Sequence, residues 1–172
     1  GLHERAPYWL NGIVPLASLL QNAGEELLPG TKGIYKAKST TGGPIPPVNI
    51  TEQANKYINS IRGSQHADGW LGPVDNPKDG NTYWGRSNVI LSLAMYAEAN
   101  PSEFKNVTEV MLNYMLEQSR RMNNKSYAPL QGWAAARWID MALGAEWMLD
   151  NAPQGKETEL FQYLTDLHEQ GS

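Results

Sequence analysis

The residues best suited to chemistry lie between Ser64 and Asn88, in the stretch SQHADGWLGPVDNPKDGNTYWGRSN. Trp70 and Trp84 stand beside carboxylates there, although a plain connector needs only polar and turn-forming residues. Sugar rings present apolar C–H faces and hydroxyl edges, so a carbohydrate site combines a flat aromatic platform with polar groups at its margin. We therefore predict that this segment lines a carbohydrate site.

The same segment also holds polar residues that could supply that margin. They are Asp68, Asp75, Arg86 and Asn88. Gly69 and Gly72 would let the backbone turn sharply and place Trp70 at a rim. The alternative for both tryptophans is a packing role at the end of a helical core.

Asp68 is the best local candidate for acid–base work, because burial beside an indole would raise the pKa of its carboxyl group. The alternative is a carboxylate that caps a tight turn. A glycosidase needs a second carboxyl group about 5 to 9 Å away. Asp140 is a candidate, although an ion pair with Arg137 explains it equally well. The catalytic residues therefore stay unassigned.

Trp133 and Arg137 open a later apolar helix. If the apolar helices line a common hollow, their first residues converge on one rim, and residues distant in sequence can share a pocket there. His3, His66 and His168 are scattered and match no metal-ligand spacing on a helix. We expect no metal and no other cofactor.

Composition narrows the class of protein. The chain has 172 residues, 41% of them hydrophobic, which suits one domain with a single core. A net charge of -4 without a dense Lys/Arg cluster argues against a nucleic-acid partner, and no apolar run approaches the roughly 20 residues that span a bilayer. Three N-x-S/T sequons favour a secreted glycoprotein, unless they are coincidental in an Asn-rich chain: Asn49, Asn106 and Asn124.

Hydrophobic periodicity predicts six helices and no strand. The expected helices cover Tyr8–Gln21, a segment capped by Asn49 that reaches Arg62, Trp84–Ala99, a segment capped by Asn100 that reaches about Met122, Trp133–Leu149 and Lys156–Glu169. The first, third and fifth are apolar almost all round, whereas the others have one apolar face. This alternation predicts helical hairpins with buried inner helices and covering outer helices.

A ring of hairpins is favoured over a linear solenoid, because no repeated consensus is visible and the spacing of the pairs is uneven. Three hairpins make only half of a six-hairpin ring, so we expect residues 1–172 to form part of a larger domain. The alternative is a self-contained bundle of three hairpins.

Five motifs in series resemble a known family. PYWLNGIVPLASLL, QHADGWLGP, YWGRSNVILSLAMYAEA, GWAAARWIDMALGAEWMLD and LHEQG are similar in order and approximate spacing to the DUF1680 group, which is related to the β-L-arabinofuranosidases of glycoside hydrolase family 127. The resemblance is weakest in the connector Lys32–Pro47. It implies an (α/α)6 barrel, generally followed by β-sandwich modules, of which this chain would be the early hairpins.

The resemblance also implies a catalytic glutamate and a zinc-bound cysteine cluster containing the nucleophile, in a later part of the barrel. This chain has no cysteine, so those roles cannot be assigned to it. In the family, polar residues of the third and fifth helices help to hold the sugar. The corresponding positions lie around Asn88 and Trp133, where relatives often have histidine.

Two functions follow from these observations. The first is part of a secreted glycoside hydrolase acting on polysaccharide or glycan side chains, with β-L-arabinofuranosides as the implied substrate class. Its partners would be the carbohydrate and the remainder of the barrel. The second is a non-catalytic helical module that binds carbohydrate or serves as a scaffold.

Overall fold

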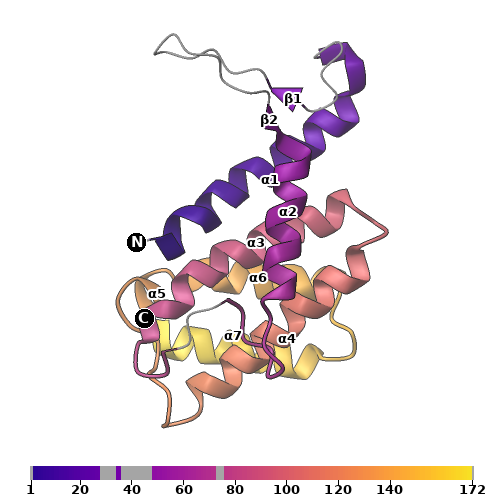
Figure 1. Ribbon diagram of the computed structural model, residues 1–172. Coiled ribbons are helices and arrows are strands. Elements are labelled where there is room, and N and C mark those ends of the chain that lie inside the picture. Colours follow the sequence, from indigo (N-terminus) through magenta and orange to yellow (C-terminus); the bar gives the residue numbers. More distant parts are fainter. Residues whose placement is uncertain (1, 28–33, 36–47, 73–75, 172) are drawn as a thin grey trace.

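The computed structural model describes residues 2–27, 34–35, 48–72 and 76–171, and the chain is mostly helical (Figure 1). The elements are α1 (Leu2–Leu27), β1 (Ile34–Tyr35), β2 (Val48–Asn49), α2 (Ile50–Gly63), the 3-10 helix η1 (Gly80–Tyr83), α3 (Trp84–Ala99), α4 (Phe104–Met122), α5 (Gly132–Ala136), α6 (Trp138–Asn151) and α7 (Glu157–Gly171). The all-α prediction is confirmed. The two short strands form an antiparallel ladder, with Ile34 opposite Asn49, that no alternating pattern predicted.

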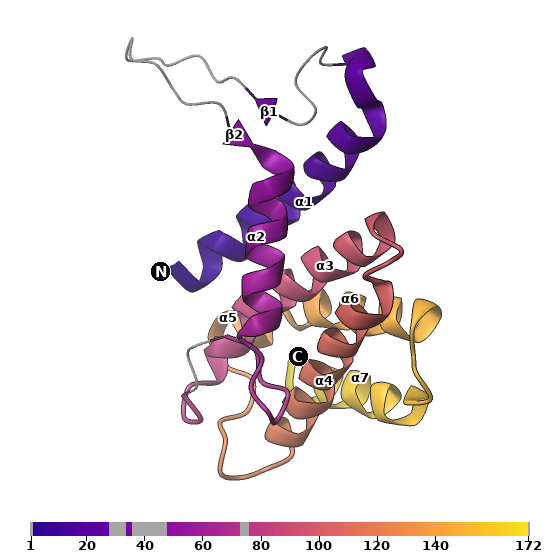
Figure 2. The same cartoon turned by 45° about the vertical axis from the view of Figure 1, so that its right-hand side comes forward.

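The long helices pair as three hairpins (Figures 1 and 2). α2 packs on α1, α4 on α3, and α7 on α6. The helix α3 contacts both α1 and α6, so α1, α3 and α6 form a central row. The outer helices are α2, α4 and α7, and α4 also contacts α7. The predicted hairpin pairing is therefore present.

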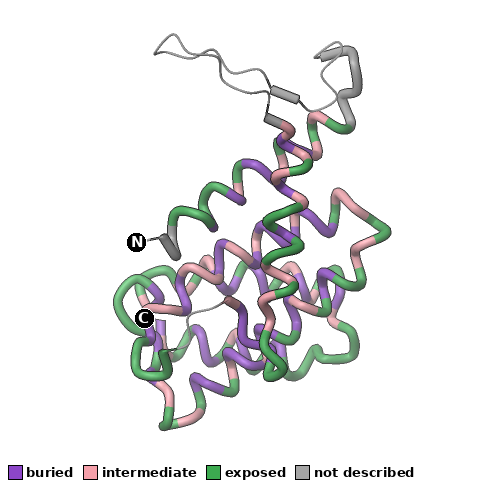
Figure 3. Tube along the Cα trace, in the orientation of Figure 1, coloured by how far each residue is buried: buried purple, intermediate pink, exposed green. Residues whose placement is uncertain are grey.

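The helices of the central row differ in burial (Figure 3). Most of α3 is buried, as predicted, because it has a neighbour in the row on each side. α1 and α6 are buried on fewer sides than the apolar composition of these helices predicted. Leu16 and Leu19 of α1 are 43% and 65% exposed, and Ile139 and Leu143 of α6 are 57% and 49% exposed. Both helices carry apolar side chains that no described residue covers.

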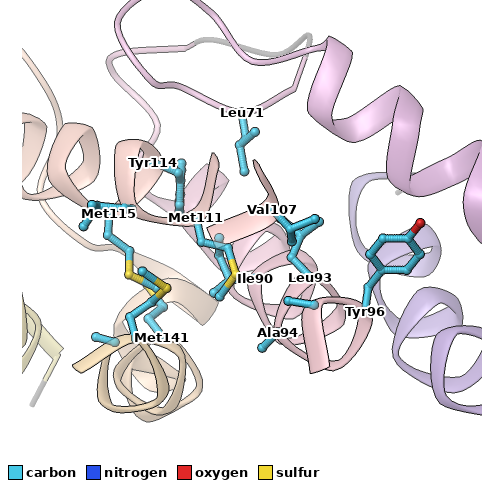
Figure 4. Packing of buried hydrophobic residues seen from close by; sticks show 14 of the residues in the cluster. Leu71, Ile90, Leu93, Ala94, Tyr96, Val107, Met111, Tyr114, Met115 and Met141 are labelled. Carbon is cyan, nitrogen blue, oxygen red and sulfur yellow. The ribbon is translucent and has the colours of Figure 1, made fainter. Parts of the chain in front are cut away.

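Buried apolar side chains of α3, α4 and α6 pack together in the core (Figure 4). Leu93 of α3 and Met111 and Met115 of α4 are fully buried, and Met141 of α6 is 2% exposed. Close approach of α6 to α3 depends on Gly144, because a Cβ atom there would lie 2.7 Å from the Ile90 Cγ2 atom. The small residue therefore sets the spacing within the central row.

Local signals explain only some helix ends: α4 begins at Phe104, three residues after the start that the Asn100 cap predicted, and its N-cap residue Glu103 makes no side-chain cap hydrogen bond. Asn49 caps α2 by accepting a hydrogen bond of 2.9 Å from the Glu52 N–H, as its capping sequence predicted. The bounds predicted for α3 are confirmed. The predicted helix Trp133–Leu149 is instead broken at Arg137, which separates α5 from α6. Apart from β1, the connector Lys32–Pro47 lies outside the described residues.

Candidate functional site

The loop after α2 turns Trp70 into the core, and this corrects the prediction that it stands at a rim. Trp70 is 1% exposed. Its ring lies between two guanidinium groups, with Arg86 Cζ 4.1 Å and Arg121 Cζ 3.9 Å from the ring centroid. It also meets the Tyr83 and Tyr114 rings at 5.6 and 5.7 Å. A buried indole held between two cations is a packing element, which was the alternative stated for it.

The loop is fixed to α4 by backbone contacts that explain this orientation. The Gln65 side-chain amide donates to the carbonyl oxygens of Gly69 and Val110, each at 2.9 Å. Gly69 has a φ of +98°, and a Cβ atom there would lie 2.5 Å from the Asn113 carbonyl oxygen. Only glycine fits this conformation and this gap. The turn therefore drives Trp70 inward.

Asp68 is ionised and helps to fix the loop that follows α2. Its Oδ1 accepts from the Trp70 N–H at 3.0 Å, and its Oδ2 lies 3.1 Å from Arg121 Nη2. Partial burial raises the pKa of the carboxyl group, but the Trp70 N–H and the Arg121 cation outweigh burial and hold the pKa below its ordinary value. The general-acid role needs a raised pKa, so these contacts favour the turn-capping alternative for Asp68.

Arg121 and Arg86 also hold the loop that follows α2 in place. Arg121 is 1% exposed and its Nε lies 2.6 Å from Oε1 of the buried Glu117, which also binds the exposed Arg120. Arg86 donates from Nε to the Leu71 carbonyl oxygen at 2.7 Å and from Nη1 to that of Thr82. The predicted sugar-binding role of Arg86 therefore competes with two backbone contacts that fix the loop.

A different group of aromatic residues gathers where α1, α3 and α5 begin. The Trp84 ring lies 5.9 Å from the Tyr8 ring and 5.8 Å from the Trp133 ring, measured between centroids. Tyr8 and Trp133 are 45% and 57% exposed, whereas Trp84 is 8% exposed. The structure thus brings together Trp84 and Trp133, as predicted, and adds Tyr8. We call these three residues, with the polar residues described next, the aromatic mouth.

Three polar residues follow Tyr8 and Trp84 by one to two turns along α1 and α3. The Asn11 amide donates to Asn88 Oδ1 at 3.1 Å, and the Ser92 hydroxyl hydrogen-bonds Asn11 Oδ1. Asn88 is 4% exposed, yet its Nδ2 has no acceptor among the described residues, and the same holds for the Trp84 Nε1. Buried donors without partners are unusual, because each loses its hydration and gains nothing in return. Pro15 also cannot donate the helical hydrogen bond to the Asn11 carbonyl oxygen.

Two loops hold Trp133 beside Trp84. The Trp133 N–H donates to Asn81 Oδ1 at 2.9 Å, and the Ala128 N–H donates to the Pro77 carbonyl oxygen at 2.6 Å. The fit is close at Gly80, where a Cβ atom would lie 1.7 Å from the Pro129 carbonyl oxygen. Segments about fifty residues apart in sequence therefore lock against each other at the mouth.

Arg137 and Asp75 are the remaining predicted residues of the carbohydrate site. Arg137 is exposed and its Nη1 lies 3.7 Å from Asp140 Oδ2, which fits the ion-pair alternative for this pair. Asp75 lies outside the described residues. Among the side chains that the structure describes, no cluster of three histidine, cysteine or acidic residues could hold a metal.

The predicted glycosylation sites have different surroundings. Asn106 is exposed on α4, whereas Asn49 is partly buried and its side chain caps α2. Asn124 is also partly buried, and its Oδ1 accepts from the Ser126 N–H at 2.9 Å. Attachment of a glycan at Asn106 would leave the described contacts intact.

Sequence reasoning missed three mouth residues: Tyr8, Asn11 and Ser92. A signal for two of them was available. Asn11 and Ser92 are polar residues within apolar helices, and Ser92 lies one helical turn after Asn88. A polar residue on a buried helix face needs a partner, so the pair could have been expected to meet.

No protein-family model matches the chain, and searches of curated proteins and of solved structures found no significant match. Among the described residues, no helix has the length and apolar content that crossing a bilayer requires.

Proposed function

We propose that the aromatic mouth binds carbohydrate and forms one wall of the active site of a secreted glycoside hydrolase that acts on polysaccharide or glycan side chains. The observation that carries this proposal is the exposed Trp133 ring packed against Trp84, with Tyr8 as a second exposed ring on Trp84. The C–H face of a sugar would cover the exposed indole of Trp133. β-L-arabinofuranosides are the substrate class that the sequence resemblance favours.

The proposal includes a ring of hairpins that continues beyond the central row. Exposed apolar side chains on both flanking helices support it: Leu16 and Leu19 on α1, and Ile139 and Leu143 on α6. Apolar faces of this kind normally meet another surface. Further hairpins of an (α/α)6 barrel would cover both faces and would supply the catalytic residues.

The second candidate is a non-catalytic carbohydrate-binding or scaffold module. Asp68 favours it, because the carboxylate first considered for catalysis is paired with Arg121 and has a lowered pKa. The two functions share the sugar-binding mouth and differ only in turnover.

Calorimetric titration with a β-L-arabinofuranosyl disaccharide tests the proposal. Trp133→Ala should weaken binding by about 5- to 150-fold, corresponding to about 1 to 3 kcal/mol for loss of one stacking platform. Phe161→Ala is the matched control, because Phe161 is 60% exposed on the outer helix α7. Equal affinities for the parent and Trp133→Ala would refute the mouth as the binding site. Release of free sugar from the same ligand separates the hydrolase from the module.

A further inference from the structure

We propose that a groove between α1 and α2 is a second saccharide site, selective for a sugar unit that carries a carboxylate, such as a hexuronate. The groove has a volume of about 410 Å³. Trp9, Gln53, Lys56, Tyr57 and Ser60 line it. Figure 2 shows α2 lying across α1, and the two helices are in contact. This site is separate from the aromatic mouth and none of its lining residues belongs to the mouth.

Two aromatic rings form the apolar part of the groove. The Trp9 and Tyr57 ring centroids lie 4.8 Å apart and the ring planes meet at 61°. The rings therefore form a corner rather than a flat stack. Both side chains remain about two-fifths exposed, at 41% and 43%. A corner of this kind covers the C–H face of a pyranose ring with one aromatic plane and its edge with the other.

Polar groups stand along one side of this corner. Gln53 and Ser60 lie four positions before and three positions after Tyr57 on α2, and Lys56 lies three positions after Gln53 and four before Ser60. An amide and a hydroxyl can each donate to and accept from sugar hydroxyls. A purely apolar partner would leave these groups dehydrated and unpaired, so the groove fits a polyhydroxylated ligand better.

The charge of the groove selects an anionic ligand. Lys56 has no carboxylate within ion-pair distance among the described residues, although Glu52 lies one turn earlier on α2. Arg5 is exposed one turn before Trp9 on α1, although it is not among the residues that line the groove. The net charge of the whole chain is -4, so the positive charge of Lys56 in the groove is opposite in sign to the net charge. A carboxylate on the ligand would pair with Lys56 and gain a charge-assisted hydrogen bond.

Titration with trigalacturonate, followed by calorimetry on the full chain, tests this proposal. The parent should bind saturably, and Trp9→Ala and Lys56→Gln should each weaken binding at least fivefold. The methyl-esterified trisaccharide, which has the same rings without the charge, should also bind at least fivefold more weakly. Trp133→Ala should leave trigalacturonate binding unchanged, because it alters only the mouth.

Three results would refute the groove as a saccharide site. One is the absence of saturable binding to trigalacturonate. Another is loss of trigalacturonate binding in Trp133→Ala with none in Trp9→Ala, which would assign the ligand to the mouth instead. The third is equal affinity for triglutamate, since the site would then recognise charge alone. Failure of arabinofuranoside binding at the mouth would affect none of these measurements, so the two proposals stand or fall separately.

Discussion

Replacing Arg121 with methionine tests whether the buried cluster holds the loop that follows α2. Methionine keeps much of the side-chain volume but removes the 2.6 Å contact with Glu117, the 3.1 Å contact with Asp68 and the cation that faces the Trp70 ring. Glu117 is 4% exposed and would retain only Arg120 as a partner. Breaking a buried ion pair from one side leaves a charge without its compensation.

The expected loss in the free energy of unfolding is about 3 to 4 kcal/mol. Removal of one partner of a buried pair costs about 3 to 5 kcal/mol, and the stacking on Trp70 adds about 0.5 to 2 kcal/mol. Retention of Arg120 on Glu117 reduces the sum. For a chain of this length the change corresponds to a fall in Tm of about 6 to 16 °C. Urea and thermal unfolding followed by circular dichroism measure both quantities.

A double variant separates loss of the pair from loss of packing. Arg121→Met combined with Glu117→Leu removes both buried charges, and should recover at least half of the stability lost by Arg121→Met alone. Lys156→Met is the surface control, because the Lys156–Glu159 pair is 45% exposed on each side and should contribute little to stability. Two results would refute the reasoning: an Arg121→Met variant whose stability is within about 1 kcal/mol of the parent, or a double variant that is no more stable than Arg121→Met alone.

Two further predictions concern the same loop. Gly69→Ala forces a side chain into a backbone with φ of +98° and towards the Asn113 carbonyl oxygen, so it should lower the free energy of unfolding by about 1 to 3 kcal/mol in urea; an unchanged midpoint would contradict the proposed close fit. Asp68→Asn should lower stability near neutral pH and by progressively less as the pH falls below 3.8, because the folded carboxyl has a pKa lower than this ordinary value and its contribution is lost as pH falls through the lower value. Urea unfolding at several pH values checks this, and a difference that does not vary with pH would contradict it.

The helical architecture could be predicted because its signals are local. The cap at Asn49 and the unbroken apolar run from Trp84 to Ala99 each depend on neighbours within one or two turns. The break at Arg137 was missed because apolar residues continue on both sides of it. Hydrophobic periodicity does not indicate the backbone angles at that residue.

The site was only partly predictable, because its geometry depends on residues far apart in sequence. Trp84 and Trp133 were correctly expected to share one end of the helices. Trp70 was misplaced because its orientation depends on Arg121, a residue about fifty positions away that carries no sequence signal for stacking. Likewise, Asp68 was read as a buried acid because the sequence does not show the cation that faces it.

The interlocked loops beside the mouth have a thermodynamic consequence. With Gly80 against Pro129 and the Trp133 N–H bonded to Asn81, the indole is already oriented in the free protein. A ligand that docks there meets a preorganised wall and loses little of its binding free energy to immobilising the loops. Selectivity among sugars at this wall would then reflect shape and hydroxyl placement more than adaptation of the protein.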